Sequence, residues 1–444
     1  MLSHEDLEFF SRVGKGTPVG EVLRRYWTPA LPAADLPRPG CPPVEFRILG
    51  EDLVAFRDKT GKVGVLDRYC SHRGASLGIA AVEDCGLRCI YHGWLFDTEG
   101  TIVETPNMPA TSKFKDINRQ GSYPAREAGG LIWVYIGPPE EEPPFPNYHF
   151  MDQPGESINV REWHIPVNWL QVHEGQIDSS HVSVLHRAID RPDPQPVPEV
   201  AAATGVVKFG GWQWETPPDG SPTDNSPSFD RAPVFEVEDT DFGFHYAALR
   251  SSLYGDDRKY VRVTALVFPY MAYIPPRGGP ATTVPIDDYN TVTFSVSLPS
   301  FDPEGRMNPV LFGTAEAPPT PPRSERTLVV PPQDRQAMDE GRSFSGWWGV
   351  PMQDAAVHYS MGKIYDRHNE HLVSPADAAV VRFRHILRDE ARRVARGERV
   401  RYAFGTLPTE TIEAGSGIVP DGHAWHELVP GNRAPSEPAP APAS

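Results

Sequence analysis

Two short runs of cysteine and histidine hold the residues whose types and spacing are best suited to bind metal. Cys70-Ser71-His72 forms the first run and Cys89-Ile90-Tyr91-His92 the second, with residues 73–88 between them. Such a set could hold one zinc ion, or a 2Fe–2S cluster in which two Cys bind one iron and two His the other. Zinc sites rarely place Cys and His this close together in both halves, so the spacing favours the cluster, with zinc as the alternative.

A second group of metal-binding residue types lies within residues 168–186. Asp178 and His181 are three residues apart and would share one face of a helix. His181 and His186 are five residues apart, which is about 140° around an ideal helix. Both imidazoles could bind one metal only if the helix is distorted between them, by a π-type bulge or by a break. We therefore predict such a distortion.

Two imidazoles and one carboxylate on one face of a metal are typical of the non-haem iron sites that activate oxygen. The carboxylate must come from another part of the chain. Asp354, in the run Gly349-Val350-Pro351-Met352-Gln353-Asp354, is best placed. Chemistry alone does not separate it from three other carboxylates, which are Asp366, Asp339 and Glu340.

These motifs resemble those of a known family. Arg73-Gly74 and Gly93-Trp94, which flank the first two runs, are similar to the flanks in Rieske iron–sulfur proteins. Taken with the second group, the chain resembles the α-subunit of Rieske non-haem iron aromatic-ring-hydroxylating oxygenases, in the phthalate dioxygenase-like branch, up to its Pro/Ala-rich end. The residues that carry this closer resemblance are Gln171, Glu174-Gly175, Asp178, His181, His186, Gln353-Asp354, Asp366-Arg367 and Glu370-His371-Leu372.

The resemblance implies a role for individual residues. The ligands of the Rieske 2Fe–2S cluster would be Cys70, His72, Cys89 and His92. The ligands of a mononuclear Fe(II) would be His181, His186 and Asp354. Asp178 would bridge a cluster histidine, His92, and His181 of a neighbouring subunit, so that a homotrimer or a hexamer is implied. A carboxylate between two metal-bound imidazoles can accept a hydrogen bond from each. His173 matches no ligand position, and we expect it behind the ligands or at the surface.

The resemblance also implies the activity. The chain would be a terminal oxygenase component that hydroxylates an aromatic substrate with O2. A separate reductase with flavin and its own iron–sulfur centre would supply electrons from NADH or NADPH. An aromatic carboxylate, dihydroxylated as phthalate is, is the leading substrate class, and Arg250 is the candidate partner for its carboxylate. Monooxygenation with aryl-ether cleavage or O-demethylation would use the same metal ligands and stays an alternative.

Composition excludes several other classes of function. The chain has 444 residues, with 42 Lys and Arg against 59 Asp and Glu, and its net charge of −17 argues against nucleic acid and anionic membranes as partners. No Gly-x-Gly-x-x-Gly motif follows a predicted strand, so no dinucleotide site is expected. Beyond Cys70 and Cys89, only Cys41 and Cys85 remain, and we expect both as free thiols. The acidic start, which has no signal-peptide pattern, and the absence of a long apolar run predict a cytoplasmic protein without a membrane span.

Hydrophobic patterning predicts an α+β fold in two domains. An N-terminal helix and an all-β Rieske domain would occupy residues 1–145, and a catalytic domain with an antiparallel sheet and helices, of helix-grip type, residues 146–431. A disordered Pro/Ala tail would follow at 432–444. Strands are expected at 44–49, 53–57, 63–66, 131–135, 260–268 and 291–298, and helices at 3–13, near 167–188 and at 375–396. Ser374 and Asp377 predict a capping box for the last helix.

Two other classes of protein are compatible with parts of the pattern. A stand-alone Rieske electron carrier would need only the first domain, and the long second domain with its own His pair argues against it. A structural zinc protein with a β-rich binding module would explain the Cys/His runs without redox chemistry. Both alternatives predict a protein that lacks mononuclear iron.

Overall fold

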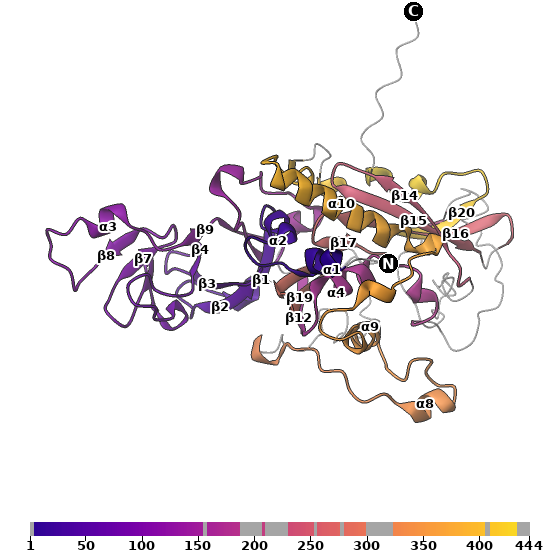
Figure 1. Cartoon of the computed structure of the whole chain (residues 1–444), viewed down its shortest axis with the longest axis horizontal. Coiled ribbons are helices and arrows are strands. Elements are labelled where there is room, and N and C mark those ends of the chain that lie inside the picture. Colours follow the sequence, from indigo (N-terminus) through magenta and orange to yellow (C-terminus); the bar gives the residue numbers. More distant parts are fainter. Residues whose placement is uncertain are drawn as a thin grey trace, which may run out of the picture.

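The computed structural model describes residues 4–153, 158–186, 207–208, 230–252, 255–275, 279–298, 323–404 and 409–432. A small β-domain, formed by the first third of the chain, projects from a larger domain in which helices pack on a sheet (Figure 1). All strand pairs named in the large sheet are antiparallel. The expected α+β fold, with an all-β domain first, is therefore confirmed.

The first third of the chain begins with two short helices, which contact helices of the larger domain, and continues as the short strands of the small domain. Its elements are α1 (His4–Ser11), α2 (Pro18–Leu23), β1 (Thr28–Pro32), β2 (Val44–Ile48), β3 (Glu51–Arg57), β4 (Val63–Asp67), β5 (Ala81–Glu83), β6 (Gly86–Arg88), β7 (Leu95–Asp97), β8 (Ile102–Glu104), α3 (Phe114–Ile117), β9 (Ser122–Tyr123), β10 (Ala125–Ala128) and β11 (Leu131–Val134). The described strands form sheets in the orders β2-β3-β4-β9, β5-β6-β7-β8 and β1-β11-β10. The strands predicted at 44–49, 53–57, 63–66 and 131–135 are confirmed.

The two Cys/His runs are loops that follow strands of this domain. Cys70 comes three residues after β4, and Cys89 comes directly after β6. Val54, Phe56, Leu66, Leu87 and Phe96 pack beneath both loops in one buried cluster. The small domain is thus a rigid support that holds the two runs side by side.

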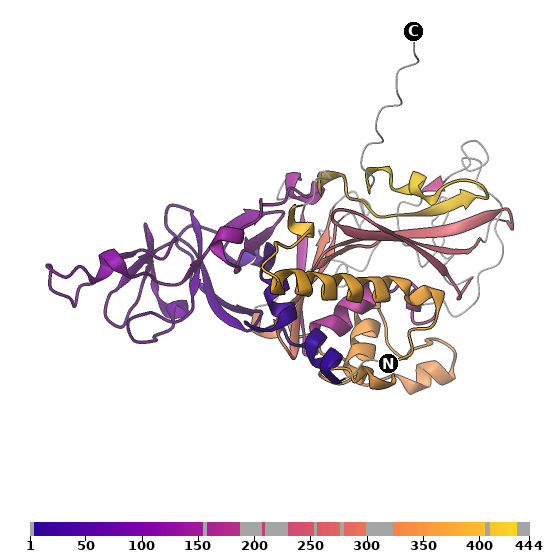
Figure 2. The ribbon, with the colours of Figure 1, turned by 45° about the horizontal axis from the view of Figure 1, so that its top comes forward.

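The larger domain is built on one long, twisted sheet. Its described elements are β12 (Asn159–Ile165), α4 (Trp169–Gln176), β13 (Val207–Lys208), β14 (Val234–Asp239), β15 (Gly243–Ser251), β16 (Arg258–Val267), β17 (Met271–Tyr273), β18 (Ala281–Asp287), β19 (Asn290–Ser297), α8 (Arg335–Asp339), α9 (Val350–Ser360), α10 (Ala378–Ala395) and β20 (Gly415–Pro420). The described strands run in the order β12-β19-β18-β17-β16-β15-β14, and β20 pairs with β16 and β13. In Figure 2, α10 runs along one face of these strands. The strands predicted at 260–268 and 291–298 are β16 and β19.

The longest helix of the described chain begins and ends as the sequence predicts. The side chains of Ser374 and Asp377 form the capping box, and a turn of 3-10 helix leads into α10. Val380, Phe383 and Leu387 are buried on the face that contacts the sheet and α2. The predicted apolar stripe is thus the face that this helix buries.

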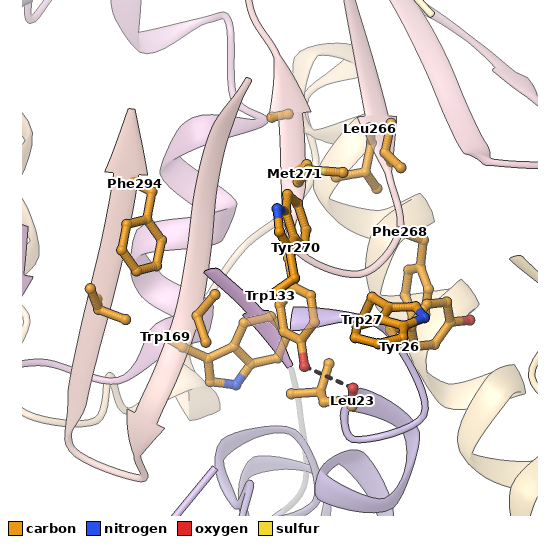
Figure 3. Packing of buried hydrophobic residues seen from close by; sticks show 14 of the residues in the cluster. Leu23, Tyr26, Trp27, Trp133, Trp169, Leu266, Phe268, Tyr270, Met271 and Phe294 are labelled. Carbon is orange, nitrogen blue, oxygen red and sulfur yellow. Dashed lines mark hydrogen bonds between the residues drawn. The ribbon is translucent and has the colours of Figure 1, made fainter. Parts of the chain in front are cut away.

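Aromatic side chains fill the junction between the two domains (Figure 3). Trp27 and Trp133 of the small domain lie in the same buried cluster as Phe268 and Tyr270 of the large domain. The Tyr270 hydroxyl donates a hydrogen bond to the Leu23 carbonyl oxygen at 2.8 Å. Because this contact is buried and apolar, the domains pack as one unit.

The segment between the domains is packed as well. Trp27 donates its indole N–H to the Pro143 carbonyl at 3.0 Å, and Phe145 lies edge-on to Trp27 and near Trp133. At the other end, Asn432 is 2% exposed and accepts a hydrogen bond from the backbone N–H of Glu413. Asn432 therefore belongs to the packed structure rather than to the tail, and the remaining tail residues, 433–444, lie outside the described residues. In the described part of the chain, no helix is long and apolar enough to cross a membrane.

A network of buried charges joins α4 to α10. Glu174 on α4 accepts from Arg384 of α10 at 2.6 Å and from Arg367 at 3.0 Å. Arg384 also pairs with Glu370. Although burial alone would raise the pKa of Glu174, the charges of Arg367 and Arg384 outweigh it and lower that pKa. The network therefore holds an ionised carboxylate inside the domain.

We expect Arg384→Ala to destabilise the protein by about 3–5 kcal/mol, because it leaves the largely buried Glu370 without this partner and leaves Glu174 paired with Arg367 alone. Urea unfolding would measure the loss. The control is Arg382→Ala, on the same helix as Arg384. It removes a more exposed pair between Arg382 and Asp239 of β14 and should cost less than about 1 kcal/mol. Equal losses in the two variants would contradict a structural role for the network.

Candidate metal centres

The two Cys/His loops have matching turns. The backbone N–H of Gly74 donates to the Cys70 carbonyl at 2.8 Å, and that of Gly93 donates to the Cys89 carbonyl at 2.9 Å. Both glycines have positive φ, +71° and +77°, which explains the glycine after each predicted ligand pair. Each turn aims one cysteine and one histidine at the same space.

The thiols and imidazoles of these loops form two separate pairs. Cys70 and Cys89 are buried and interact with each other, and burial is the main cause that raises the pKa of the Cys70 thiol to about 11. The rings of His72 and His92 are 4.5 Å apart between centroids and lie further outward, partly exposed. His72 also stacks on the buried Trp94 ring.

This arrangement fits a two-metal cluster better than a single zinc ion. With bonds of at most about 2.3 Å, the ligand atoms of one zinc ion lie within about 4.6 Å of one another. Among the described residues, three or more ligand atoms gather within 4.8 Å at two other places and not at these loops. A thiol pair on one side and an imidazole pair on the other suit the two irons of a Rieske cluster.

The helical path is interrupted after α4, as the spacing of His181 and His186 predicts. Helix α4 ends at Gln176, and His181–Ser183 forms a separate turn of 3-10 helix followed by an irregular turn through His186. The distortion is a break rather than a π-type bulge. It lets two imidazoles that are five residues apart face one point.

The three predicted iron ligands converge at that point. His186 Nε2 is 3.0 Å from Asp354 Oδ1 and 3.2 Å from His181 Nε2, and His181 Nε2 is 3.6 Å from the same carboxylate oxygen. Ligand atoms about 2.1 Å from a metal and at right angles lie about 3.0 Å apart. The donor set and its spacing therefore fit a mononuclear iron with open positions. Asp366, Asp339 and Glu340 do not belong to this group.

The other nitrogen of each imidazole is held by a specific partner. His181 Nδ1 lies 3.2 Å from Asp178 Oδ2, and Asp178 is itself fixed by the backbone N–H and hydroxyl of Ser180. His186 Nδ1 lies 2.6 Å from Gln353 Oε1. Because both Nδ1 atoms face oxygen acceptors, each histidine would keep its proton there and leave Nε2 for the metal.

Gln353 is a residue whose role the sequence did not reveal. Its amide nitrogen donates to Ser345 Oγ and to the Trp347 carbonyl, both at 3.1 Å. These two acceptors fix the amide so that its oxygen must face His186. Its signals in the sequence were its position next to Asp354 and its place in the Gln353-Asp354 run that carries the family resemblance.

Electrostatics favour an ionised carboxylate at this centre. Burial alone would raise the pKa of Asp354, but the charge and hydrogen bond of His186, with the charge of His181, lower it to about 2. Burial would lower the pKa of His181, but Asp178 outweighs it and raises that pKa. Asp354 and Asp178 thus place negative charge on two sides of the His181 ring, which favours a cation at the site.

A cavity of about 150 Å³ opens beside these three side chains. Its walls are mostly apolar and come from β12, α4, β19 and α9. Residues that line the cavity include Trp163, Ile165, Val172, Phe294, Leu328 and Val350, with Tyr246, Arg262, Thr264 and His358 as polar members. An apolar cavity of about this size takes up a benzene ring.

The arginine that lines the cavity lies on the strand next to the one that carries the predicted arginine. Arg250, the predicted residue, is buried, but it does not line the cavity; it donates to the Ser179 carbonyl at 2.6 Å and to Ser183 Oγ. It therefore positions the segment that carries His181. Arg262 lines the cavity instead, with Thr264 on the same face of β16, and its Nη2 donates to the Pro275 carbonyl at 2.9 Å. Its signal was an arginine between two valines, Val261 and Val263, of a predicted strand.

Two further histidines lie near the centre. His173, expected behind the ligands or at the surface, is fully buried between Trp169 and Phe383, so the surface placement is wrong. Burial lowers its pKa to about 3. His358, which sequence reasoning missed, lies one turn after Asp354 and lines the cavity. A Cβ at Gly175 would lie 2.6 Å from His358 Nε2, so this glycine permits the close approach of α4 and α9.

Comparison with known proteins gives matches over both domains. A family model described as the Rieske [2Fe-2S] domain matches residues 26–115, and one described as LigXa C-terminal domain like matches residues 134–304 and 325–437. The oxygenase subunit of phthalate 4,5-dioxygenase from Pseudomonas putida is 36% identical over 409 residues, covering 90% of this chain and 88% of that protein.

Two more relatives extend the comparison. The oxygenase subunit of 3-chlorobenzoate-3,4-dioxygenase from Comamonas testosteroni is 33% identical over 445 residues, covering 95% of this chain and 94% of that protein. The crystal structure of dicamba monooxygenase bound to 3,6-dichlorosalicylic acid has a TM-score of 0.56 at 17% identity, and the match covers 84% of this chain and 98% of that chain. The structural match supports the fold.

We expect Gln353→Leu to weaken retention of the mononuclear iron by about 10- to 100-fold, since His186 loses the partner that orients it. Iron per chain after dialysis against a chelator would measure this, and visible absorbance would show that the 2Fe–2S cluster is unchanged. Gln336→Leu, on the exposed surface of α8, is the matched control. If both variants keep as much iron as the unaltered protein, the contact does not orient the ligand.

Proposed function

Because this chain belongs to the family of Rieske oxygenase subunits, we propose that it oxidises an aromatic carboxylate with O2, using electrons from a separate protein. It is an oxygenase with a Rieske cluster and a mononuclear iron as its cofactors. The observation that carries the substrate class is Arg262, a guanidinium that is 1% exposed and lines an apolar cavity next to the iron ligands.

The chemistry of the cavity supports this class of substrate. A guanidinium is always charged and presents a planar fork of donors that matches a carboxylate. The rest of the wall suits one aromatic ring, with Trp163 and Phe294 among its side chains. The relatives named for phthalate and 3-chlorobenzoate also act on aromatic carboxylates.

Different residues would have different roles in the reaction. Cys70, His72, Cys89 and His92 would hold the cluster, and His181, His186 and Asp354 the mononuclear iron. The iron, when bound, supplies O2 activation with its open coordination positions. Arg262 would hold the substrate carboxylate and so fix which ring carbons face the iron. The apolar walls would keep water from the reacting atoms.

We assign the bridge between the metal centres to Asp178, acting between two subunits. Within one chain the cluster loops are far from the iron ligands: β7, which follows His92, and α9, which carries Asp354, lie well apart in Figure 1. The loops also expose apolar side chains at Tyr69, Ile79, Ile90 and Tyr91. A second copy of the chain that covers this patch would place its Asp178 next to His92 of the first copy. In a ring of three copies, every cluster would then have a neighbouring iron centre.

The electron donor is proposed from the family, and the domain boundary is proposed from the sequence pattern. A reductase that carries flavin and an iron–sulfur centre, and draws on NADH or NADPH, is the proposed partner. The domain boundary would lie at residues 145 and 146, within the packed segment that contains Pro143 and Phe145. The location in the cytoplasm stays a prediction from the sequence.

A single turnover with labelled oxygen tests the proposed function. Chemically reduced protein would be mixed with ¹⁸O₂ and a panel of aromatic acids and their methyl esters, and products would be identified by mass spectrometry. We expect an acid to gain two labelled atoms as a non-aromatic diol. In Arg262→Met, oxidation of that acid should fall by about 10- to 100-fold, because a charged hydrogen bond is lost.

The control for Arg262 is Lys259→Met, which removes an exposed cation from the same strand. It should oxidise the acid as the unaltered protein does. One labelled atom with loss of an alkyl or aryl fragment would mean monooxygenation and ether cleavage instead of dihydroxylation. Equal oxidation of acids and esters by the unaltered protein and Arg262→Met would overturn the carboxylate assignment.

We expect Asp178→Asn to slow substrate-dependent oxidation of the reduced cluster at least about 10-fold while both metals and the assembly stay intact. An amide has a single acceptor oxygen and no charge, so it cannot serve two imidazoles as a carboxylate does. Stopped-flow absorbance of the cluster, iron analysis and native mass would be measured together. The control is Asp366→Asn, which alters an exposed Asp–His pair, and full cluster oxidation in Asp178→Asn would refute the bridge.

A further inference from the structure

A second group of two histidines and one carboxylate lies on the large sheet, outside the cavity. Glu238 is on β14, His245 is on β15, and the two residues are direct cross-strand partners. His426 comes from the 3-10 turn Trp425–Leu428, near the end of the described chain. None of the three lines the cavity beside His181.

The ligand atoms of these residues converge. His426 Nε2 is 2.8 Å from both Glu238 oxygens, and His245 Nε2 is 3.3 Å from Glu238 Oε2. The three ligand atoms lie within 4.8 Å of one another. These separations are close to the spacing around one divalent ion with bonds of about 2.0–2.2 Å to nitrogen and oxygen.

The surroundings hold the group in place without a ligand. Trp425 stacks on His426, meets the His245 ring edge-on, and donates its indole N–H to Glu236 at 2.8 Å. His245 is 1% exposed, whereas the Glu238 side chain is 44% exposed. The site is therefore preformed on its inner side and open to solvent on its outer side.

We propose that Glu238, His245 and His426 bind a divalent transition-metal ion of the zinc class, separate from the catalytic iron. Two imidazoles and a carboxylate are a donor set that zinc takes with water as fourth ligand. The bound ion joins the hairpin of β14 and β15 to the 425–428 turn, whose His426 lies 188 residues after Glu238 in the chain. Its role is to fix the end of the described chain against the edge of the sheet, since binding to the folded form stabilises it.

Zinc uptake by the iron-loaded enzyme tests this site. With the cluster and the mononuclear iron already in place, the protein would be dialysed against ZnCl₂ and its zinc and iron measured by mass spectrometry. We expect one zinc per chain in the unaltered protein and less than a tenth of that in His426→Ala and Glu238→Gln. Zinc should also raise the unfolding temperature of the unaltered protein and not of these two variants.

The matched control is His423→Ala, since His423 lies on the segment just before the same turn but pairs only with Glu427 among the contacts described. It should bind zinc as the unaltered protein does. Substrate oxidation should be unchanged in all three variants, which also shows that they fold. The proposal is overturned if the iron-loaded, unaltered protein takes up no zinc, or if the variants and the control take up the same amount.

Discussion

The docking of α9 against α4 is the constraint on which the catalytic centre depends. His186 and Gln353 are 167 residues apart in the chain, yet their side chains meet at 2.6 Å. Gln171 of α4 makes this possible, because its amide bonds to the Gly362 carbonyl and to the Tyr365 backbone N–H just beyond α9. A shift of one helix by a side-chain width would separate Asp354 from the histidines and leave a buried carboxylate without its partners.

The same docking connects the centre to the rest of the domain. Helix α4 packs on β18 and β19, and its Glu174 is held by arginines from α10 and from the segment after α9. Any motion of α4 would break charged hydrogen bonds inside the protein, which is costly. The proposed iron ligands are therefore mounted on a rigid sheet, while O2 and substrate need only enter the cavity.

The sequence predicted the parts of the centre that are local in the chain. The spacing of Cys70, His72, Cys89 and His92 defines two loops, and the five-residue interval between His181 and His186 requires a break that the structure contains. Strand alternation predicted the strands at 44–49, 53–57, 63–66, 131–135, 260–268 and 291–298, and the capping box predicted the start of α10. These features depend on residues within one turn or one strand of each other.

The parts that were missed depend on partners distant in the chain. Whether an arginine in a strand faces a cavity depends on what packs over it, so Arg250 and Arg262 could not be told apart by pattern, although they lie on paired strands. Gln353 and His358 likewise acquire their roles only when α9 meets α4.

Two His–His–carboxylate groups in one chain show what makes such a group catalytic. Their donor types are the same, and their ligand atoms are similarly close. The difference lies around them: Asp178 and Gln353 orient both imidazoles at the first centre, and an apolar cavity with Arg262 excludes bulk water beside it. At the second, Glu238 faces solvent at the edge of the sheet. Oxygen chemistry requires a substrate held next to the metal, and the first centre provides an apolar cavity for it. Ligand identity therefore selects a metal, and the enclosure decides what the metal can do.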